Sequence, residues 1–384
     1  MTGRHFDAIV VGTGPAGATA AHALGRAGAR TLLIEKHRLP RDKTCGGGLT
    51  AKVVKALGID LRPVIEHTVA TLDLSWRLSR PALLRSPDPL VYMVQRSRFD
   101  AYLAEQAVAT GNVTLIEGAA VRSVRHEGRR VQVDTALDSY SADYLVGADG
   151  ATGLSARALG LMRMRRLLPA VESQVMVDAR TLERWRDRMG IDMGTMRGAY
   201  GWVFPKCDHL NVGVGCFSPE GSNARSLNRY AAEHLAARLQ GHGRVTRQVG
   251  FVLPLRAPRA PIQQGRAVLV GDAAGLVEGF SGEGIYWAIR SAQLAAAAIV
   301  EHQGAALGEL GYQRAVEEQL MPELVEARRW AQLYLWWPQG CYAVPKHWPA
   351  AWRAVCAVLR GDRSFRQIGK SFGPLSSLPI FRPA

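Results

Sequence analysis

A glycine-rich turn near the start of the chain has the residue types and the spacing that bind a nucleotide diphosphate. The apolar run at residues 9–11 leads directly into Gly12-Thr-Gly14-Pro-Ala16-Gly17. In this pattern Gly12 permits a tight turn, Gly14 lets a pyrophosphate approach the backbone, and Gly17 lets the following helix pack closely on the strand. The free N–H groups at the start of that helix, where Ala16 lies, then face the phosphates.

An acidic residue completes this unit. Residues 31–34 form a second apolar run, and Glu35 follows it, eighteen positions after Gly17. A carboxylate at this place can accept hydrogen bonds from both hydroxyls of a ribose and repels a 2′-phosphate. Strand, helix, strand and acid together predict a dinucleotide-binding βαβ unit that takes FAD or NAD rather than NADP.

A second glycine-rich stretch follows a basic loop. Cys45 precedes three consecutive glycines, Gly46-Gly47-Gly48. Three glycines in a row let the backbone approach something flat or bulky, or they form a flexible hinge. The first interpretation predicts a ligand against this loop.

An aromatic stretch lies in the middle of the chain. It reads Tyr200-Gly-Trp202-Val-Phe204-Pro205. Alternating residues of a strand point to one face, so the three rings predict one aromatic wall. Ordinary packing in a β core is the alternative interpretation.

Two acids stand at the ends of apolar strands, where open α/β sheets bind ligands. They belong to Asp149-Gly150 and Gly271-Asp272. After the second acid, Ser281-Gly-Glu-Gly284-Ile285 precedes an alanine-rich helix, and its free N–H groups predict a place for a ligand with partial negative charge. A simple helix cap is the alternative for this segment, as it is for a lone aspartate at a strand end.

The order of these segments predicts an α/β protein whose nucleotide-binding domain is discontinuous. The first part of that domain comprises residues 1–165 and includes a small antiparallel sheet near 113–143, and the second part comprises 255–305. Residues 166–254 are predicted to form an inserted, mostly antiparallel β domain that binds substrate. Residues 306–384 are predicted to be helical.

The composition limits the kinds of partner. Lys and Arg number 48 against 33 Asp and Glu, a formal net charge of +15, which favours anionic partners unless the arginines are merely solvated. The five cysteines are scattered without a metal-ligand spacing, which predicts a reducing compartment and no metal site. We expect a cytoplasmic protein without a signal peptide or a transmembrane helix, and no nucleic-acid partner, because no known basic-aromatic module is present.

Taken in this order, the Gly12 turn, Asp149-Gly150 and Gly271-Asp272 resemble the signature of flavoproteins that include aromatic hydroxylases, halogenases and isoprenoid reductases. The resemblance covers about residues 6–300 and implies a Rossmann-type domain that binds FAD. It assigns Asp272 to a ribityl hydroxyl of FAD, and Val121, by its backbone, to the adenine. The resemblance also assigns Arg96 to the cofactor, with Arg98 as the competing candidate for that role.

Within that class, the chain is similar to the geranylgeranyl reductase family. The similarity rests on the Cys45 loop, on Gly271-Asp-Ala-Ala-Gly275 with the segment 282–285, and on the aromatic stretch. It implies that Cys45 and the glycines after it, Gly46 and Gly48, lie against the flavin ring with Gly284 and Ile285. It also implies that Tyr200, Trp202 and Phe204 line a long apolar cavity.

The function that the resemblance implies is FAD-dependent saturation of isoprenoid double bonds. Hydride would come from the reduced flavin, and a proton from Cys45, a tyrosine or water. Only one dinucleotide turn is present, so NAD(P)H or a reduced ferredoxin is expected to dock transiently as the electron donor. A flavin monooxygenase or halogenase is the alternative, and a protein that holds FAD without turnover is a third hypothesis.

The C-terminal region is rich in tryptophan. Five of the nine tryptophans lie between Trp330 and Trp352, interspersed with arginine and lysine. Tryptophan beside a basic residue suits the surface of an anionic membrane. A lid or core over the substrate cavity is the alternative role for these rings.

Overall fold

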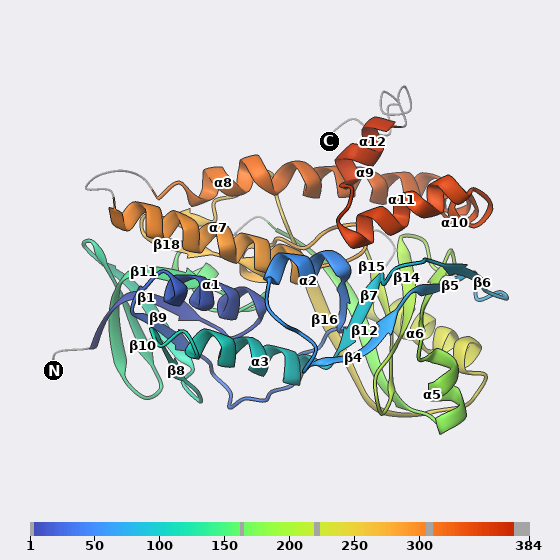
Figure 1. Cartoon of the computed structure of the whole chain (residues 1–384), viewed down its shortest axis with the longest axis horizontal. Helices are drawn as coiled ribbons and strands as arrows, with labels where there is room; N and C mark the ends of the chain where they lie inside the picture. The colour runs from blue at the N-terminus through green and yellow to red at the C-terminus, as the bar shows by residue number, and fades with distance from the viewer. Residues whose placement is uncertain (1–3, 162–164, 219–222, 305–309, 372–384) are drawn as a thin grey trace.

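The computed structural model describes residues 4–161, 165–218, 223–304 and 310–371. Two large sheets lie side by side along the molecule, and the C-terminal helices run along one flank of both (Figure 1). This arrangement confirms the predicted fold class: an α/β Rossmann-type domain, a second domain made mostly of antiparallel strands, and a helical C-terminal region.

The first sheet has a parallel core, as expected for a nucleotide-binding domain. Its strand order is β17-β18-β11-β1-β2-β8, and the neighbours from β18 to β8 are parallel. The hairpin β9–β10 joins it antiparallel to β11. The strands span β1 Arg4–Val11, β2 Thr31–Ile34, β8 Val113–Ile116, β9 Val121–Glu127, β10 Arg130–Thr135, β11 Ser139–Gly147, β17 Gln263–Gln264 and β18 Ala267–Leu269.

One part of the sequence prediction is corrected here. The small antiparallel sheet was expected near 113–143, but β8 pairs parallel with β2 in the main sheet, and only β9 and β10 with β11 make antiparallel pairs. Helix α3 (Arg96–Val108) returns the chain to the open edge of β2. Alternating residues in Val113–Ile116 fit an edge strand of either kind of sheet, so sequence periodicity does not distinguish the two.

The second sheet has the order β16-β12-β15-β14-β13-β5-β6. Two of its strands, β5 and β6, come from residues 71–85, a segment that the sequence analysis placed in the cofactor domain. β5 pairs parallel with β13, a non-local contact that local patterning does not show. The strands span β5 Thr71–Trp76, β6 Ala82–Arg85, β12 Arg165–Met176, β13 Arg188–Met193, β14 Ala199–Pro205, β15 Leu210–Cys216 and β16 Arg244–Arg256.

A three-stranded sheet connects the two large ones. It consists of β3 (Gly48–Thr50), β7 (Val91–Val94) and β4 (Ile65–Val69), with β7 in the middle. Because β3 begins at Gly48, the Cys45 loop ends where this small sheet starts. The loop is therefore held between the cofactor domain and the second sheet.

Helices cover both sheets. α1 (Pro15–Arg26) packs against α3 and α7 (Ile285–Gly304) over the first sheet. The remaining helices span α2 Ala51–Leu57, α4 Ser155–Ala158, α5 Ala179–Trp185, α6 Ala224–Leu239, η1 Gly271–Ala274, α8 Tyr312–Gln319, α9 Met321–Trp336, α10 Pro338–His347, α11 Pro349–Arg360 and α12 Phe365–Ser371. α8 lies beside α7, and α10 and α11 lie at the end of the molecule formed by the second sheet (Figure 1).

Candidate functional site

The glycine-rich turn between β1 and α1 has the close packing that the sequence predicts. Gly12 has φ +102°, and a Cβ there would lie 2.6 Å from the carbonyl oxygen of Ala148 on the neighbouring strand. A Cβ on Gly17 would lie 1.8 Å from the carbonyl oxygen of Gly12. Gly14, in contrast, has no atom within 4 Å of the position of a Cβ. The turn is thus closed toward the protein and open at Gly14, directly before α1.

Glu35 stands at the end of β2 and faces this turn. Its carboxylate accepts hydrogen bonds from the Thr13 backbone N–H and hydroxyl (3.2 and 2.5 Å) and from the His37 N–H (3.1 Å). Arg41 pairs with the same carboxylate at 3.0 Å. Burial raises the pKa of Glu35, but the Thr13 hydroxyl and the Arg41 charge outweigh burial and leave the pKa below its usual value.

A buried ion-pair cluster continues from Arg41. Arg41 also contacts the Asp100 carboxylate at 3.1 Å, and Arg96 binds both oxygens of Asp100 at 2.8 Å each. Burial lowers the pKa of Arg96, but Asp100 and the sulfur of Cys45 outweigh it and hold the guanidinium in its charged form. Sequence analysis did not select Arg41 or Asp100, although the four-residue spacing of Arg96 and Asp100 on one helix predicts their pairing.

The two candidate arginines at the start of α3 have different surroundings. Arg96 is buried and contacts the cysteine loop. Arg98 is exposed, donates to the Pro63 carbonyl at 3.2 Å and lies 3.8 Å from Glu66. Of the two, Arg96 is the one that the structure places beside the other predicted cofactor residues, and its contact with FAD remains a prediction.

The strand-end acids also differ. Asp272 lies in η1, half-buried, and its carboxylate makes no hydrogen bond or ion pair with another residue that the structure describes. Gly284 adjoins it, since a Cβ on Gly284 would lie 3.3 Å from Asp272 Oδ1. Asp149 instead accepts from the Ser155 N–H at 2.8 Å and so stabilises the start of α4. Val121, the predicted adenine contact, begins β9.

The segment before α7 contains an acid cluster that sequence analysis missed. Glu278 is fully buried and accepts hydrogen bonds from Phe280 and Ser281. Burial is the main cause that raises its pKa. Glu283 pairs with Lys52 of α2 at 2.5 Å. These contacts fix the loop that carries Gly282 and Gly284 in front of α7, and Ile285 begins that helix in a buried position.

The Cys45 loop packs directly on the aromatic stretch. A Cβ on Gly46 would lie 3.0 Å from the Phe204 ring and 3.4 Å from Trp202 Nε1, and one on Gly48 would lie 3.2 Å from Phe204. The structure therefore brings together two motifs that are more than 150 residues apart in the sequence. The glycines are required by this close approach.

A buried lysine holds the same loop. Lys206 Nζ donates to the carbonyl oxygens of Gly47 (3.0 Å) and Val94 (2.9 Å), which joins the loop to β7. Burial lowers the pKa of Lys206 to about 8, and the nearby Glu66 opposes this shift. Lys206 follows the aromatic stretch by one residue, but its type and position give no signal of this role in the sequence.

The three aromatic rings lie in a row on β14. Tyr200 and Trp202 have ring centroids 6.0 Å apart, and Trp202 and Phe204 6.4 Å apart. Trp202 Nε1 donates to Asn211 Oδ1 at 2.7 Å, and the Tyr200 hydroxyl donates to the Ser281 carbonyl. The row continues through Phe217 to α9, so the C-terminal helices close this region.

A polar pocket opens beside the cysteine loop. It has residues of both charge signs, and Glu172 of β12 is buried in its wall. Sequence analysis did not select Glu172. An acid at an inward position of an apolar strand is unusual, and this is the sequence signal that could have identified it. The lining residues are Asp42, Lys43, Cys45, Val94, Gln95, Arg96, Ser97, Glu172, Gln174, Lys206, His209, Asn211 and Arg247.

The residues present fit a bound FAD. The free N–H groups of α1 stand behind the open Gly14, where a diphosphate needs both donors and space. Asp272 offers a carboxylate without a partner in the described structure. The open position at Gly14 and the unpaired acid are the two features that a dinucleotide cofactor requires of the chain.

Comparisons with known proteins agree with this geometry. A family model described as an FAD binding domain matches residues 5–310. The chain is 32% identical over 365 residues to the chloroplastic geranylgeranyl diphosphate reductase of Oryza sativa subsp. japonica, covering 88% of this chain and 73% of the relative. It is 30% identical over 312 residues to digeranylgeranylglycerophospholipid reductase 1 of Methanopyrus kandleri, covering 77% and 80%.

Solved structures share the fold. A geranylgeranyl bacteriochlorophyll reductase-like protein from Thermoplasma acidophilum matches with a TM-score of 0.76 and 25% identity over 85% of this chain and 88% of that one. The flavin-dependent brominase Bmp2 matches with a TM-score of 0.74 and 19% identity over 93% and 94%, a likeness of fold alone. On the FAD-domain match and the identity to the plant enzyme, the chain belongs to the geranylgeranyl reductase family of FAD-dependent oxidoreductases.

Proposed function

We propose that this protein saturates carbon–carbon double bonds of an isoprenoid chain. The observation that carries the proposal is the contact between the Cys45 loop and the aromatic wall of Tyr200, Trp202 and Phe204. The contact supports the proposal because the rings, along which a hydrocarbon chain would lie, adjoin the loop expected at the flavin. Relatives named for the reduction of geranylgeranyl groups support the same reaction.

Bound FAD in its reduced form would supply a hydride. The Gly14 turn and α1 would hold its diphosphate, Glu35 and Asp272 would bind its hydroxyl groups, and Arg96 would bind a polar part of the cofactor. Gly284 directly precedes α7 and Ile285 begins it, and the N–H groups at this helix start stabilise negative charge in front of them. The aromatic wall holds the alkene and excludes water, and its rings also stabilise positive charge that develops on an alkene carbon.

The electron donor has to dock transiently. Gly213 and Gly215, the glycine pair that resembles a second nucleotide turn, lie within β15. NAD(P)H and a reduced ferredoxin are both anionic, and the net charge of +15 suits either one. Anaerobic reduction of the flavin by each donor separately distinguishes them.

Alkene reduction is tested directly with the FAD-loaded protein. Under anaerobic conditions, with dithionite as a general reductant, we expect a geranylgeranyl substrate to gain two hydrogens per bond reduced, as read by mass spectrometry. Replacing Cys45 with alanine tests whether the thiol passes the proton to the alkene: if it does, the reaction should slow at least tenfold with FAD retained, since general acids typically contribute 100-fold or more. Full turnover in Cys45→Ala would show that the Cys45 thiol does not donate the proton.

The same assay separates the alternative hypotheses. Oxygen consumption with a hydroxylated or halogenated product would favour a monooxygenase or halogenase, which the partial similarity of residues 200–205 to a halogenase stretch suggests. If no electron donor reduces the bound flavin, the protein holds FAD without turnover, as the third hypothesis states. A colourless protein that takes up no FAD would contradict all three.

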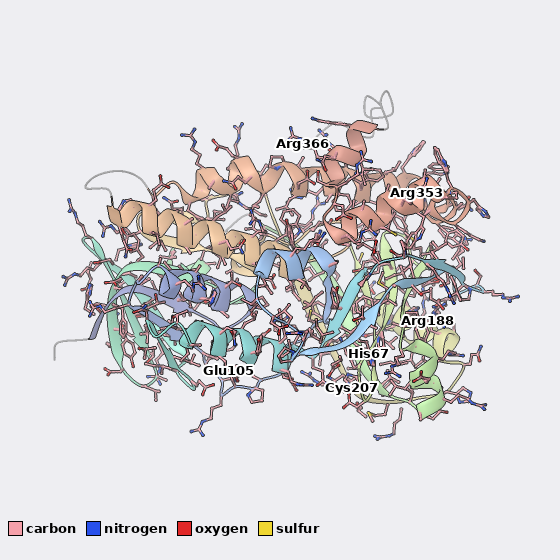
Figure 2. The ribbon with its side chains drawn as sticks, viewed as in Figure 1. His67, Glu105, Arg188, Cys207, Arg353 and Arg366 are labelled. Carbon is pink, nitrogen blue, oxygen red and sulfur yellow. The ribbon has the colours of Figure 1, made fainter. Side chains whose placement is uncertain are left out.

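The C-terminal helices expose several tryptophans. Trp336 and Trp337 at one end of α10 are 62% and 49% exposed, and Trp348 at its other end is 57% exposed. Two basic residues of the same region, Lys346 of α10 and Arg353 of α11, are exposed. Figure 2 shows Arg353 on α11, in this region, and Arg366 on α12. Trp352, in contrast, is partly buried and donates to the Arg85 carbonyl, so it belongs to the packed interior.

No helix in the described ranges is long and apolar enough to cross a bilayer. We therefore propose peripheral contact of these tryptophans and basic side chains with an anionic lipid surface, because aromatic rings favour the interface and positive charge favours anionic lipid.

Co-sedimentation with vesicles tests this contact. We expect binding to vesicles that contain phosphatidylglycerol, and weaker binding at high salt, because salt screens the basic charges. Replacing Trp336, Trp337 and Trp348 together with alanine should weaken binding at least tenfold. The control is Leu137→Ala, an equally exposed apolar residue (65%) in the turn between β10 and β11. Binding unchanged by the triple replacement, or no binding at low salt, would remove the proposal.

A further inference from the structure

Glu172 is a buried acid with an unused oxygen. It lies in the middle of β12 with 4% of its surface exposed. Its Oε2 atom is buried and has no hydrogen-bond partner among the residues that the structure describes. A buried carboxyl oxygen without a partner is costly unless the group is neutral or a ligand supplies the missing contact.

The sheet register places this acid on the same face as the aromatic wall. Glu172 lies opposite Gly213 of β15, and Gly213 lies opposite Trp202 of β14. Directly opposed residues point to one face, so the carboxyl and the indole share it. A Cβ on Gly213 would lie 2.2 Å from the Trp202 ring. The glycine therefore lets the ring extend across β15 in the direction of Glu172.

Glu172 also borders the cysteine loop. Glu172 and Cys45 both line the polar pocket. The backbone N–H of Cys45 and the side-chain amide of Asn211 interact with the Glu172 carboxyl and lower its pKa. Burial is nevertheless the dominant effect and raises the pKa of Glu172 above its usual value, against the lowering effect of Arg247 and Lys206. The other charged or titratable groups that face this pocket are Arg96 at the start of α3, Asp42, Lys43 and Cys45 of the loop, and His209 of the β14–β15 turn.

We propose that Glu172 is the proton-donating residue of the site, and that its carboxyl supplies the proton taken up when an alkene is saturated. The inference rests on the proposed reductase function and adds to it the origin of the proton. The residue borders both groups that the reaction needs close together, since it shares a face of the sheet with the aromatic wall and lines the same pocket as Cys45. A general acid must hold its proton until the bond reacts, and the burial of Glu172 favours this protonated form.

The step balances. A hydride, with two electrons, adds to one alkene carbon, and the proton of Glu172 adds to the other carbon, directly or across the Cys45 sulfur. Glu172 is left as a carboxylate and Arg247, Lys206 and Asn211 stabilise its charge. It regains a proton from water through the polar pocket. The electrons come from the external donor, NAD(P)H or ferredoxin, that reduces the cofactor between turnovers.

Replacement by glutamine tests the role, because the amide has the same shape and no acidic proton. We expect Glu172→Gln to retain FAD and to reduce the alkene about 100-fold more slowly, in single-turnover experiments as well as at steady state. Added acetic acid should restore part of the rate in Glu172→Gln, and Glu172→Asp should be less impaired. Glu105→Gln, on an exposed residue of α3 (Figure 2), is the control. Equal rates in Glu172→Gln and wild type would overturn the inference.

The pH profile and the infrared spectrum give readouts that a structural role would not change. Since the carboxyl works only when protonated, the wild-type rate should fall as the pH rises through its raised pKa, and this limb should be absent from Glu172→Gln. Infrared difference spectra of the purified protein at neutral pH should contain the C=O band of a buried protonated acid. Other buried acids such as Glu278 can contribute a similar band, so the band of Glu172 should appear in the difference between wild type and Glu172→Gln. It should be absent from the difference between wild type and Asp42→Asn, which alters an exposed acid of the same pocket.

The two hypotheses fail in different ways. Wild-type protein that binds FAD but reduces no isoprenoid would end the reductase proposal, even with the carboxylic-acid band present. Wild-type protein that reduces the alkene while its spectrum lacks that band, or while Glu172→Gln keeps full rate, would end the role of Glu172 alone. The infrared measurement needs no turnover, so it separates the two outcomes.

Discussion

Gly17→Ala is expected to yield a destabilised protein without FAD. The added Cβ would lie 1.8 Å from the carbonyl oxygen of Gly12 and 2.9 Å from its carbonyl carbon. Both are backbone atoms, so the clash cannot be relieved by turning a side chain, and α1 has to move away from β1. Overpacking of this kind costs roughly 3 kcal/mol or more. Displacement of α1 also removes the N–H groups that face the diphosphate.

Gly14→Ala is the matched comparison, because the two residues differ in what surrounds them. Gly14 has φ −65° and ψ 175°, which alanine adopts freely, and no atom lies within 4 Å of its Cβ position. We expect the fold to remain and FAD binding to weaken about a thousandfold. The loss of two charge-assisted N–H contacts, at roughly 2 kcal/mol each, accounts for this estimate.

Flavin absorbance after reconstitution, together with thermal unfolding of the protein without FAD, reads both effects. Gly17→Ala should lower the unfolding temperature and abolish yellow colour, whereas Gly14→Ala should lose only the colour. Retention of FAD by Gly14→Ala would place the diphosphate elsewhere. Normal stability of Gly17→Ala would contradict the close packing of helix and turn.

Trp202→Ala is expected to lower kcat/KM for alkene reduction at least a thousandfold while FAD remains bound. The side chain is 5% exposed, contacts the Tyr200 and Phe204 rings, and is oriented by its hydrogen bond to Asn211. Removal of the ring takes away apolar contact worth roughly 2 to 3 kcal/mol. It also leaves the alkene poorly positioned, and small misplacements commonly cost a further hundredfold.

Trp185→Ala controls for the loss of a buried indole. Trp185 of α5 is 3% exposed and packs against Gly190 and Arg238 in the second domain. Each replacement should cost roughly 3 to 5 kcal/mol of stability, but only Trp202→Ala should impair alkene reduction beyond this. Trp202→Phe, which keeps a ring and loses the Asn211 bond, provides a variant that folds. Equal activity losses in Trp202→Ala and Trp185→Ala would assign the aromatic stretch to core packing.

The two glycine-rich motifs show which parts of such a site local reasoning can reach. The Gly12 turn, Glu35 and α1 lie within 35 residues, and their roles follow from the short-range requirements of a turn and a helix start. The fold class was predictable for the same reason, since the periodicity of each segment reflects its local environment.

The parts that were not predictable depend on contacts between distant segments. The residue patterns of β5 and β8 fit more than one sheet. Which sheet each strand joins depends on where the chain crosses over, and it brings β5 beside β13 and β8 beside β2. Arg41 contacts Glu35 and Asp100 because two loops converge. Lys206 reaches the Gly47 carbonyl across two domains.

The amino-acid sequence alone determined the dinucleotide turn and the one-sided aromatic strand, because each depends on neighbours a few residues away. The choice of FAD over NAD came from the resemblance of three motifs spread over about residues 6–300. Only the tertiary structure decided that the Cys45 loop lies against that aromatic strand, and that Glu172 is buried on the same face. The physical reason is that strand pairing and side-chain burial are set by the whole packed chain, in which residues 45, 172 and 202 meet although local interactions do not connect them.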